Sequence, residues 1–182
     1  MTNYTPPRNE EHLESRSITL ADGVLIPIRS IRPDDVPALQ RLHDRLSEQT
    51  IRLRFFGPMK ELSDRKAKYF THVDGTDRLA LVALDPEEPS EIIAVVRFDR
   101  ERGTARAEYA AIVEDRWQGR GVGLRLTRLL IDAARERGIR CFYGLVLPEN
   151  EVMLSLLRDL DLPGRERRDG GTNYVEVELG AT

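Results

Sequence analysis

The chain has few of the residues that build disulfide frameworks and metal sites. Its 182 residues include a single cysteine, Cys141, which excludes an intramolecular disulfide framework and suits a reducing cytoplasm. The three histidines, His12, His43 and His72, lack the spacing of metal ligands. We therefore expect a cytoplasmic protein that holds no metal.

Long apolar runs and an excess of positive charge are also missing. No run approaches the ~20 apolar residues of a membrane helix, and the N-terminal residues lack the apolar segment of a signal peptide. The net charge is −3, which argues against a general nucleic-acid or membrane-surface binder. These features predict a protein that binds neither nucleic acid nor membrane.

The composition that remains is typical of one globular domain. Hydrophobic residues make up 40% of the chain, and its length suffices for one domain with a substantial core. Residues 1–16 are polar, with Pro6 and Pro7 near a cluster of charge, and this predicts a flexible arm. Residues 17–182 are predicted to form a single domain.

Hydrophobic periodicity and turn residues predict a mixed order of strands and helices. A hairpin is expected over residues 18–28, turning at Asp22 and Gly23, with further strands at 79–84, 91–98, 105–113, 141–147 and 174–179. Helices are expected at about 33–46, 63–73, 124–137 and 149–160. This order predicts a mixed sheet with helices on both faces.

The most informative stretch is EYAAIVEDRWQGRGVG, residues 108–123, whose pattern predicts a strand, a loop and the start of a helix. Gly119, Gly121 and Gly123 alternate just before a run of leucines with helical spacing. Such glycines let backbone N–H groups and the helix dipole approach an anion, usually a phosphate. A P-loop would need a Gly-Lys-Ser/Thr triplet, and the dinucleotide fingerprint would need its third glycine elsewhere. A plain turn is the alternative.

The segment Gln118–Gly123 resembles the acetyl-CoA loop of the GNAT N-acetyltransferases, Gln/Arg-x-x-Gly-x-Gly/Ala, at every defined position. The resemblance extends over most of the chain, from about Thr19 to Leu179. It implies the GNAT fold, a mixed α/β architecture. The fold has a central, mostly antiparallel sheet of six to seven strands with helices on both faces, splayed where acetyl-CoA binds. Acetyl-CoA is then the cosubstrate.

The same resemblance implies which residues bind acetyl-CoA. Backbone N–H groups of Val113 and the loop would bind the pantetheine and pyrophosphate, and the backbone of Ile112 or Val113 would polarise the thioester carbonyl. Asn150 matches an asparagine that hydrogen-bonds CoA, with a helix cap as the alternative. Arg120 either pairs with phosphate or faces water. The predicted cofactor-binding residues are Ile112, Val113, Gln118, Gly119, Arg120, Gly121, Val122, Gly123 and Asn150.

Glu108 is the candidate catalytic residue. A carboxylate in a strand of Ala, Tyr, Ile and Val is costly unless it is exposed, paired or functional. Residues 107–110 are similar to the motif in bacterial Pat-type protein lysine acetyltransferases whose glutamate is the general base. Segments 31–35, 53–58 and 147–150 match the same enzymes. A glutamate that merely faces solvent is the plain alternative.

The Pat-type resemblance implies direct transfer of the acetyl group to a protein lysine, for example on an acyl-CoA synthetase. Two other functions fit the same loop: a small-molecule amine N-acetyltransferase and a non-catalytic CoA-binding regulatory module. The acceptor is thus a protein lysine or a small amine. The sequence leaves the oligomeric state and the acyl chain preference open.

One departure from the GNAT pattern concerns the leaving group. Many GNAT enzymes carry a tyrosine in the last helix as general acid, whereas residues 157–162, LRDLDL, contain none. The CoA thiolate then leaves without a positioned acid, or Ser155 or a water donates the proton. Cys141 is expected to be a buried strand residue and not a nucleophile, which favours direct transfer.

The segment Arg52–Phe56 is basic and aromatic and lies where this family forms the acceptor side. One interpretation is a lip that receives a protein surface near the target lysine. The other places Phe55 and Phe56 in the core, as support for a pair of helices.

Overall fold

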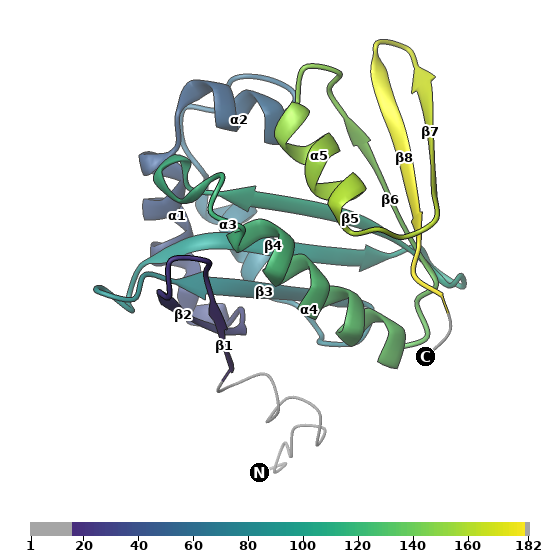
Figure 1. Cartoon of the computed structure of the whole chain (residues 1–182). Coiled ribbons are helices and arrows are strands. Elements are labelled where there is room, and N and C mark those ends of the chain that lie inside the picture. The colour runs from purple at the N-terminus through teal and green to yellow at the C-terminus, as the bar shows by residue number, and fades with distance from the viewer. Residues whose placement is uncertain (1–15, 181–182) are drawn as a thin grey trace.

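The computed structural model describes residues 16–180, which form one open sheet covered by helices (Figure 1). The sheet has eight strands in the order β1-β2-β3-β4-β5-β6-β8-β7, and all neighbours are antiparallel except β5 and β6. The strands are β1 (Arg16–Thr19), β2 (Leu25–Ser30), β3 (Arg78–Leu84), β4 (Ile92–Arg100), β5 (Arg106–Val113), β6 (Cys141–Val146), β7 (Gly164–Asp169) and β8 (Thr172–Glu178). The predicted arm lies outside the described residues, apart from Arg16, which begins β1.

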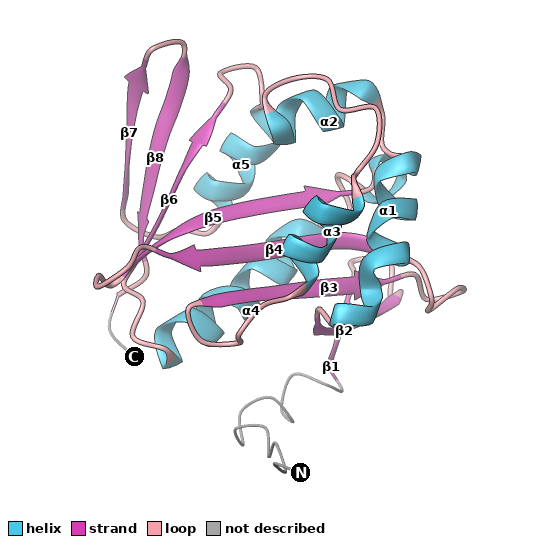
Figure 2. Cartoon of the chain, turned by 180° about the vertical axis from the view of Figure 1, so that it is seen from behind, coloured by secondary structure: helices cyan, strands magenta, loops and turns pink. Residues whose placement is uncertain are grey.

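Helices cover both faces of the sheet, as predicted (Figures 1 and 2). On one face lie α1 (Val36–Arg45), α2 (Glu48–Phe55) and α3 (Asp64–Thr71); on the other lie α4 (Val122–Glu136) and α5 (Glu151–Asp159). Pro33 begins a short 3-10 turn before α1, and Ser63 caps α3, both at the expected helix starts. Gly138, at a φ of 77°, follows the end of α4.

Two elements differ from the sequence prediction because their patterns are weak. The helix α2 occupies a basic and aromatic run that lacks amphipathic spacing, and Ser47 caps it by accepting a hydrogen bond from the Thr50 N–H at 3.1 Å. The strand β7 makes the sheet one strand larger than the six to seven expected. All of its residues, GRERRD, are exposed, so no apolar alternation marks it, and pairing with β8 holds it in place.

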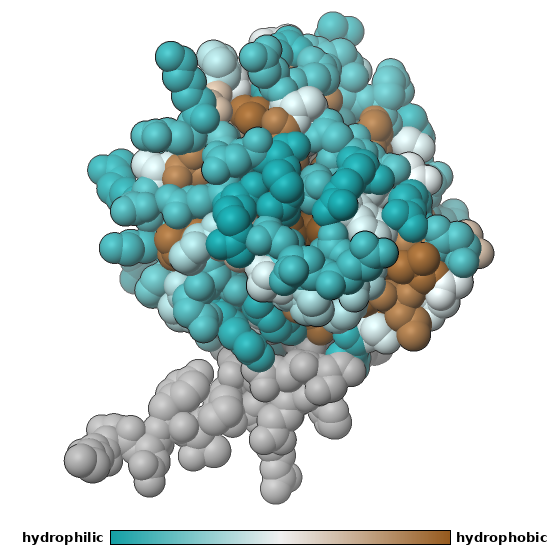
Figure 3. Space-filling view, turned by 90° about the vertical axis from the view of Figure 1, so that its left-hand side faces the viewer, coloured by the Kyte–Doolittle hydropathy of each residue, from teal (hydrophilic) through white to brown (hydrophobic). Residues whose placement is uncertain are grey.

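Two apolar cores fill the layers on either side of the sheet. Phe98, Leu126 and Leu130 are fully buried between the sheet and α4. Leu42 and Ile92 belong to the second core, beneath α1 and α3. The outer surface on the side that lies at the left of Figure 1 is largely hydrophilic, with small hydrophobic patches (Figure 3).

The feature that positions the site is the separation of β5 from β6. These parallel strands pair only where Arg106–Glu108 meets Cys141–Tyr143 in the described register, and beyond it they diverge (Figure 1). Gly144 sits at the point of divergence, where a Cβ atom would lie 3.2 Å from the Tyr109 carbonyl oxygen. The splay predicted from the resemblance is therefore present.

Candidate active site

A cleft of about 660 Å³ opens where β5 and β6 separate. Its walls come from both strands, from the glycine loop that follows β5, and from α2 and α5. Of the residues predicted for the site, the cleft brings together Glu108, Ile112, Val113, Gln118, Gly119, Gly121, Val122, Gly123 and Asn150. Arg120 is the predicted residue that does not line it.

The glycine loop presents backbone donors to the cleft at the start of α4. Gly119 and Gly121 have φ angles of 71° and 84°, a left-handed conformation that glycine adopts without strain. Gly121 precedes the first helical residue, Val122, and no side chain caps the first turn. A Cβ on Gly123 would lie 3.1 Å from Leu156 and 3.3 Å from Val113, so glycine keeps the wall open. Free first-turn N–H groups suit a phosphate.

The side chains of Gln118 and Arg120 hold the loop in shape. The Gln118 Nε2 donates to the Val113 carbonyl at 2.9 Å and to the Thr50 hydroxyl at 3.2 Å. The Arg120 guanidinium pairs with Asp22 at 2.7 Å and lies 4.3 Å from the Trp117 ring centroid. Their direct contribution to an anion site would therefore come from their backbone N–H groups.

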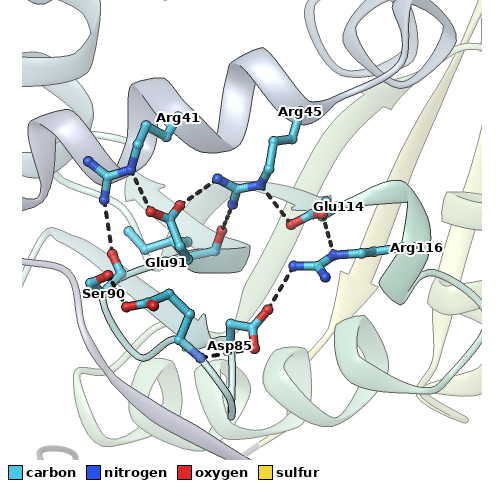
Figure 4. A network of polar contacts seen from close by, with 9 residues as sticks. Arg41, Arg45, Asp85, Ser90, Glu91, Glu114 and Arg116 are labelled. Carbon is cyan, nitrogen blue, oxygen red and sulfur yellow. Dashed lines mark hydrogen bonds and ion pairs between the residues drawn. The ribbon is translucent and has the colours of Figure 1, made fainter.

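An ionic network fixes the exit of β5 into this loop (Figure 4). The buried Glu114 carboxylate accepts from Arg45 at 3.2 Å and from Arg116 at 2.5 Å. Arg45 also donates to Glu91, and Arg116 to Asp85, so the 85–91 turn and α1 are tied to the same carboxylate. Charge-assisted hydrogen bonds of this kind orient a backbone more firmly than neutral ones.

Glu108 is the last residue of β5 that pairs with β6, and its exposed side chain faces the cleft. Its register partner on β4 is Asp99, so two carboxylates stand opposite each other. Arg78 and Arg97 pair with Asp99 at 3.0 and 3.3 Å and balance its charge. Glu108 itself forms no ion pair within 4.0 Å among the described residues, which leaves its carboxylate open to a ligand.

The strand register decides which backbone N–H groups of β5 face the cleft. The Glu114 N–H donates to the Ile93 carbonyl on β4 at 2.8 Å. Successive N–H groups of a strand point to opposite sides, so the Ile112 N–H also points to β4 and the Val113 N–H to the cleft. Of the two predicted backbone contacts, Val113 is the one whose N–H is oriented for a ligand.

This combination of a splayed parallel pair, a glycine loop and a helix start has a counterpart among known proteins. The model of the Acetyltransferase (GNAT) family matches residues 39–161, more than half of the chain. The chain belongs to this family. It is therefore an acetyl-CoA-dependent acyltransferase.

Three relatives of this GNAT acetyltransferase illustrate the range of similarity. The chain is 30% identical to Acetyltransferase PA5475 of Pseudomonas aeruginosa over 86% of its own length and 85% of the relative. It is 32% identical to Acetyltransferase Pat of Mycolicibacterium smegmatis over 89% of this chain, but spans only 48% of that relative. The structure of the GNAT domain of S. lividans PAT superposes with a TM-score of 0.85 at 32% identity, covering 96% of this chain and 99% of the other.

The helix α5 forms one wall of the GNAT cleft. Asn150 caps this helix, accepting a hydrogen bond from the Met153 N–H at 3.1 Å, and it also lines the cleft. The cap interpretation is thus confirmed, and a bond to CoA stays a prediction. Ser155 lines the same wall and is exposed.

The segment Arg52–Phe56, expected on the acceptor side, belongs to α2 and its end, and sequence reasoning missed that this segment is helical. Thr50, Leu53, Arg54 and Phe56 line the cleft from this helix. Each of the two interpretations of the aromatic pair holds for one residue. Phe55 packs against the core beneath α1 and α3, whereas Phe56 is 48% exposed. The left-handed φ of 63° at Phe56 ends the helix. The Gly57-Pro58 pair that follows was the available sequence signal for this helix end.

A hydrogen-bonded cluster joins α2 to the cofactor loop. The Asp115 carboxylate accepts from the Ser47 hydroxyl at 2.6 Å and the Thr50 hydroxyl at 2.8 Å. Burial would raise the pKa of Asp115, but the hydrogen bonds from Ser47 and Thr50 outweigh it and lower the pKa. These bonds hold the start of α2 against the turn that leads into the glycine loop.

Tyr109, next to the candidate base, is not available for proton transfer. Its hydroxyl is hydrogen-bonded to the Thr127 hydroxyl at 2.7 Å, and burial raises the pKa of Tyr109 above its ordinary value. Cys141 does not line the cleft, and burial raises the pKa of its thiol. Neither group has the position and ionisation of a nucleophile or a general base.

Residues 16–180 hold no cluster of three or more His, Cys, Asp or Glu side chains arranged for a metal ion. Within the same residues, no helix combines the length and apolarity needed to cross a membrane.

Proposed function

We propose that this GNAT acetyltransferase transfers the acetyl group of acetyl-CoA directly to a protein lysine, with Glu108 as the general base. The observation that carries the proposal is the open Glu108 carboxylate in the cleft where β5 and β6 separate. The similarity to the GNAT domain of S. lividans PAT and to mycobacterial Pat supports a lysine acceptor. An acyl-CoA synthetase is the candidate protein substrate.

The chemistry requires a neutral amine beside the thioester. A lysine ammonium has an ordinary pKa of about 10.4, so near neutral pH a base must remove a proton before the nitrogen can attack. Glu108 would accept that proton, and the neutral amine would then attack the thioester carbon. The second N–H proton would leave as the tetrahedral intermediate collapses, to the CoA thiolate or to water. The C–N bond forms, the C–S bond breaks, and CoA leaves as a thiolate.

The cofactor side of the cleft would stabilise the charges that this reaction involves. The Val113 N–H is oriented to polarise the thioester carbonyl. Backbone N–H groups of Gly119, Gly121 and Gly123 at the start of α4 would bind the pyrophosphate. The cleft volume of about 660 Å³ accommodates an extended pantetheine arm.

The thiolate side has no tyrosine in the region where many GNAT enzymes place one. Ser155 is the hydroxyl of α5 that lines the cleft, and Asn150 begins the same helix. We assign proton delivery to the thiolate to Ser155 or to water. A Ser155→Ala variant separates these, since loss of turnover is expected only in the first case.

The test is a Glu108→Gln variant assayed with acetyl-CoA and a purified acyl-CoA synthetase, with acetylated lysines identified by mass spectrometry. Turnover should fall by about 10²–10⁴-fold while acetyl-CoA affinity, measured by calorimetry, stays at the wild-type value. Unchanged turnover would remove Glu108 from the mechanism. Acetylation of small amines but of no protein lysine would replace the protein substrate by a small-molecule one.

A further inference from the structure

Arg54 is a cation of the cleft that has no close ion-pair partner among the described residues. Other arginines near the site are paired: Arg97 with Asp99, Arg45 with Glu91 and Glu114, and Arg106 with Glu176. Within residues 16–180, by contrast, the Arg54 guanidinium makes no hydrogen bond and no ion pair. The guanidinium lies 5.0 Å from the centroid of the Phe55 ring. The carboxylates of Glu108 and Asp99 attract it, but from beyond ion-pair distance.

The surroundings of Arg54 make the lack of a close ion pair energetically unfavourable. The side chain is half-buried on α2, between the cleft and a second cavity of about 40 Å³ that no carboxylate lines. Burial, and after it the neighbouring Arg97 cation, lower the pKa of Arg54 to about 10, so at neutral pH it is still charged. The attraction of the Glu108 and Asp99 carboxylates offsets only part of this shift. A guanidinium held in this way is poised to bind an anion, and its planar fork matches a carboxylate.

The position of Arg54 relative to Glu108 indicates which substrate carries that anion. Both side chains line the cleft on the sheet face that α1, α2 and α3 cover, and Arg54 also contacts the cavity over Ala110 and Ile112. The cofactor loop and α4 lie at the end of β5 and on its other face. The anion therefore comes with the molecule that enters from the α2 side, the acceptor.

We propose that Arg54 binds a carboxylate of the acceptor, next to the amine that is acetylated. This inference rests on the proposed function, because it places the amine at Glu108. The cleft would then bind two opposite charges of one acceptor: Glu108 would face the amine, and Arg54 would bind the carboxylate. The source is either an acidic side chain beside the target lysine in a protein, or the α-carboxylate of a free amino acid.

The test uses CoA conjugates, whose CoA part secures binding whether or not turnover occurs. In one pair, CoA is joined through an acetyl bridge to the central lysine of a blocked tripeptide flanked by glutamates or by glutamines. In the other pair, it is joined to the α-amine of alanine or of alaninamide. Affinities are measured by calorimetry for the wild type, Arg54→Gln and Arg52→Gln.

The matched control is Arg52, on the same helix. It pairs with Glu149 at 2.6 Å and does not line the cleft. We expect the wild type and Arg52→Gln to bind the carboxylate member of one pair about tenfold more tightly than the amide member, as a charged hydrogen-bonded pair predicts. In Arg54→Gln the preference should vanish, while the amide member binds as it does to the wild type.

The outcomes are distinct. A preference within the lysine pair identifies a protein acceptor, and one within the alanine pair identifies an amino acid. No preference in the wild type, or a preference that survives in Arg54→Gln, overturns the proposal. Failure of the proposed function appears elsewhere, as unchanged turnover of Glu108→Gln, and leaves the conjugate affinities interpretable.

Discussion

At the scale of single residues, the charged side chains at the cleft differ in how closely they are paired. The carboxylate of Asp99, opposite Glu108, is balanced by Arg78 and Arg97. Arg54 has no ion pair among the described residues, and the attraction of the more distant Glu108 and Asp99 carboxylates does not offset its burial. Unpaired charge in a half-buried position destabilises a fold, so its presence at a cleft points to a use in binding.

We expect that replacing Arg54 stabilises the protein. Arg54→Met keeps the length and flexibility of the side chain and removes the charge, so the free energy of unfolding should rise by about 1–2 kcal/mol. The folded-state pKa lies below the unfolded one, so the penalty is fully present at neutral pH and fades only as the pH rises past about 10. Urea denaturation at pH 7 measures it.

Arg52→Met serves as the comparison for that measurement. Its partner Glu149 is 44% exposed, and a surface ion pair of this kind contributes little, so the variant should change stability by less than about 1 kcal/mol. A loss of stability in Arg54→Met would show that the guanidinium packs favourably where it lies and would contradict the argument.

At the scale of elements, the glycine loop and the first turn of α4 form one unit. Gly121 adopts a φ of 84°, which an L-residue with a Cβ occupies at a cost of about 1–2 kcal/mol. An alanine there would relax toward negative φ and turn the first N–H groups of α4 away from the cleft. Loop shape and anion binding are therefore linked through this residue.

Gly121→Ala should lower the affinity for acetyl-CoA about tenfold or more, measured by calorimetry. Gly103→Ala is the control, because Gly103 has a φ of 74° in the turn between β4 and β5, away from the cleft. Both variants should lose similar stability, but only Gly121→Ala should lose affinity. Equal acetyl-CoA affinity in the two variants would show that loop shape does not govern binding.

The same elements show how much the sequence predicts. The loop and α4 were predictable because three glycines and helically spaced leucines are strong local signals, and the hairpin before α1 was predictable from Asp22 and Gly23. The helix α2 and the strand β7 were not, since their charged residues carry no period and their places depend on tertiary contacts. No sequence signal indicates that Arg54 lacks an ion pair, because ion pairing depends on residues far apart in the chain.

At the scale of the whole molecule, the two halves of the sheet are joined only by the short pairing of β5 with β6. Pairing between β5 and β6 covers Arg106–Glu108 and Cys141–Tyr143, and the described strands separate beyond it. The polar groups of 109–113 that face β6 thus lack a neighbouring strand over most of the cleft. An extended ligand with amide groups can take the place of that neighbour.

Acetyl-CoA should accordingly stiffen the centre of the molecule. At 100 times its Kd, it should raise the free energy of unfolding by about 2.7 kcal/mol, and hydrogen exchange should slow most in residues 109–113 and 119–123. Mass spectrometry of exchange, with and without acetyl-CoA, measures both regions. Protection confined to β1 and β2, at the far edge of the sheet, would contradict this expectation.

The gap between β5 and β6 leaves a strand edge uncovered in the protein without bound substrate. An exposed strand edge can recruit a strand from another chain, and sheet proteins usually block such edges with charge, bulges or covering segments. Here the edge lies inside the cleft, and we expect bound acetyl-CoA to cover it. The supply of one metabolite would then determine how well this protein resists aggregation, so CoA added during purification should raise the yield of monodisperse protein.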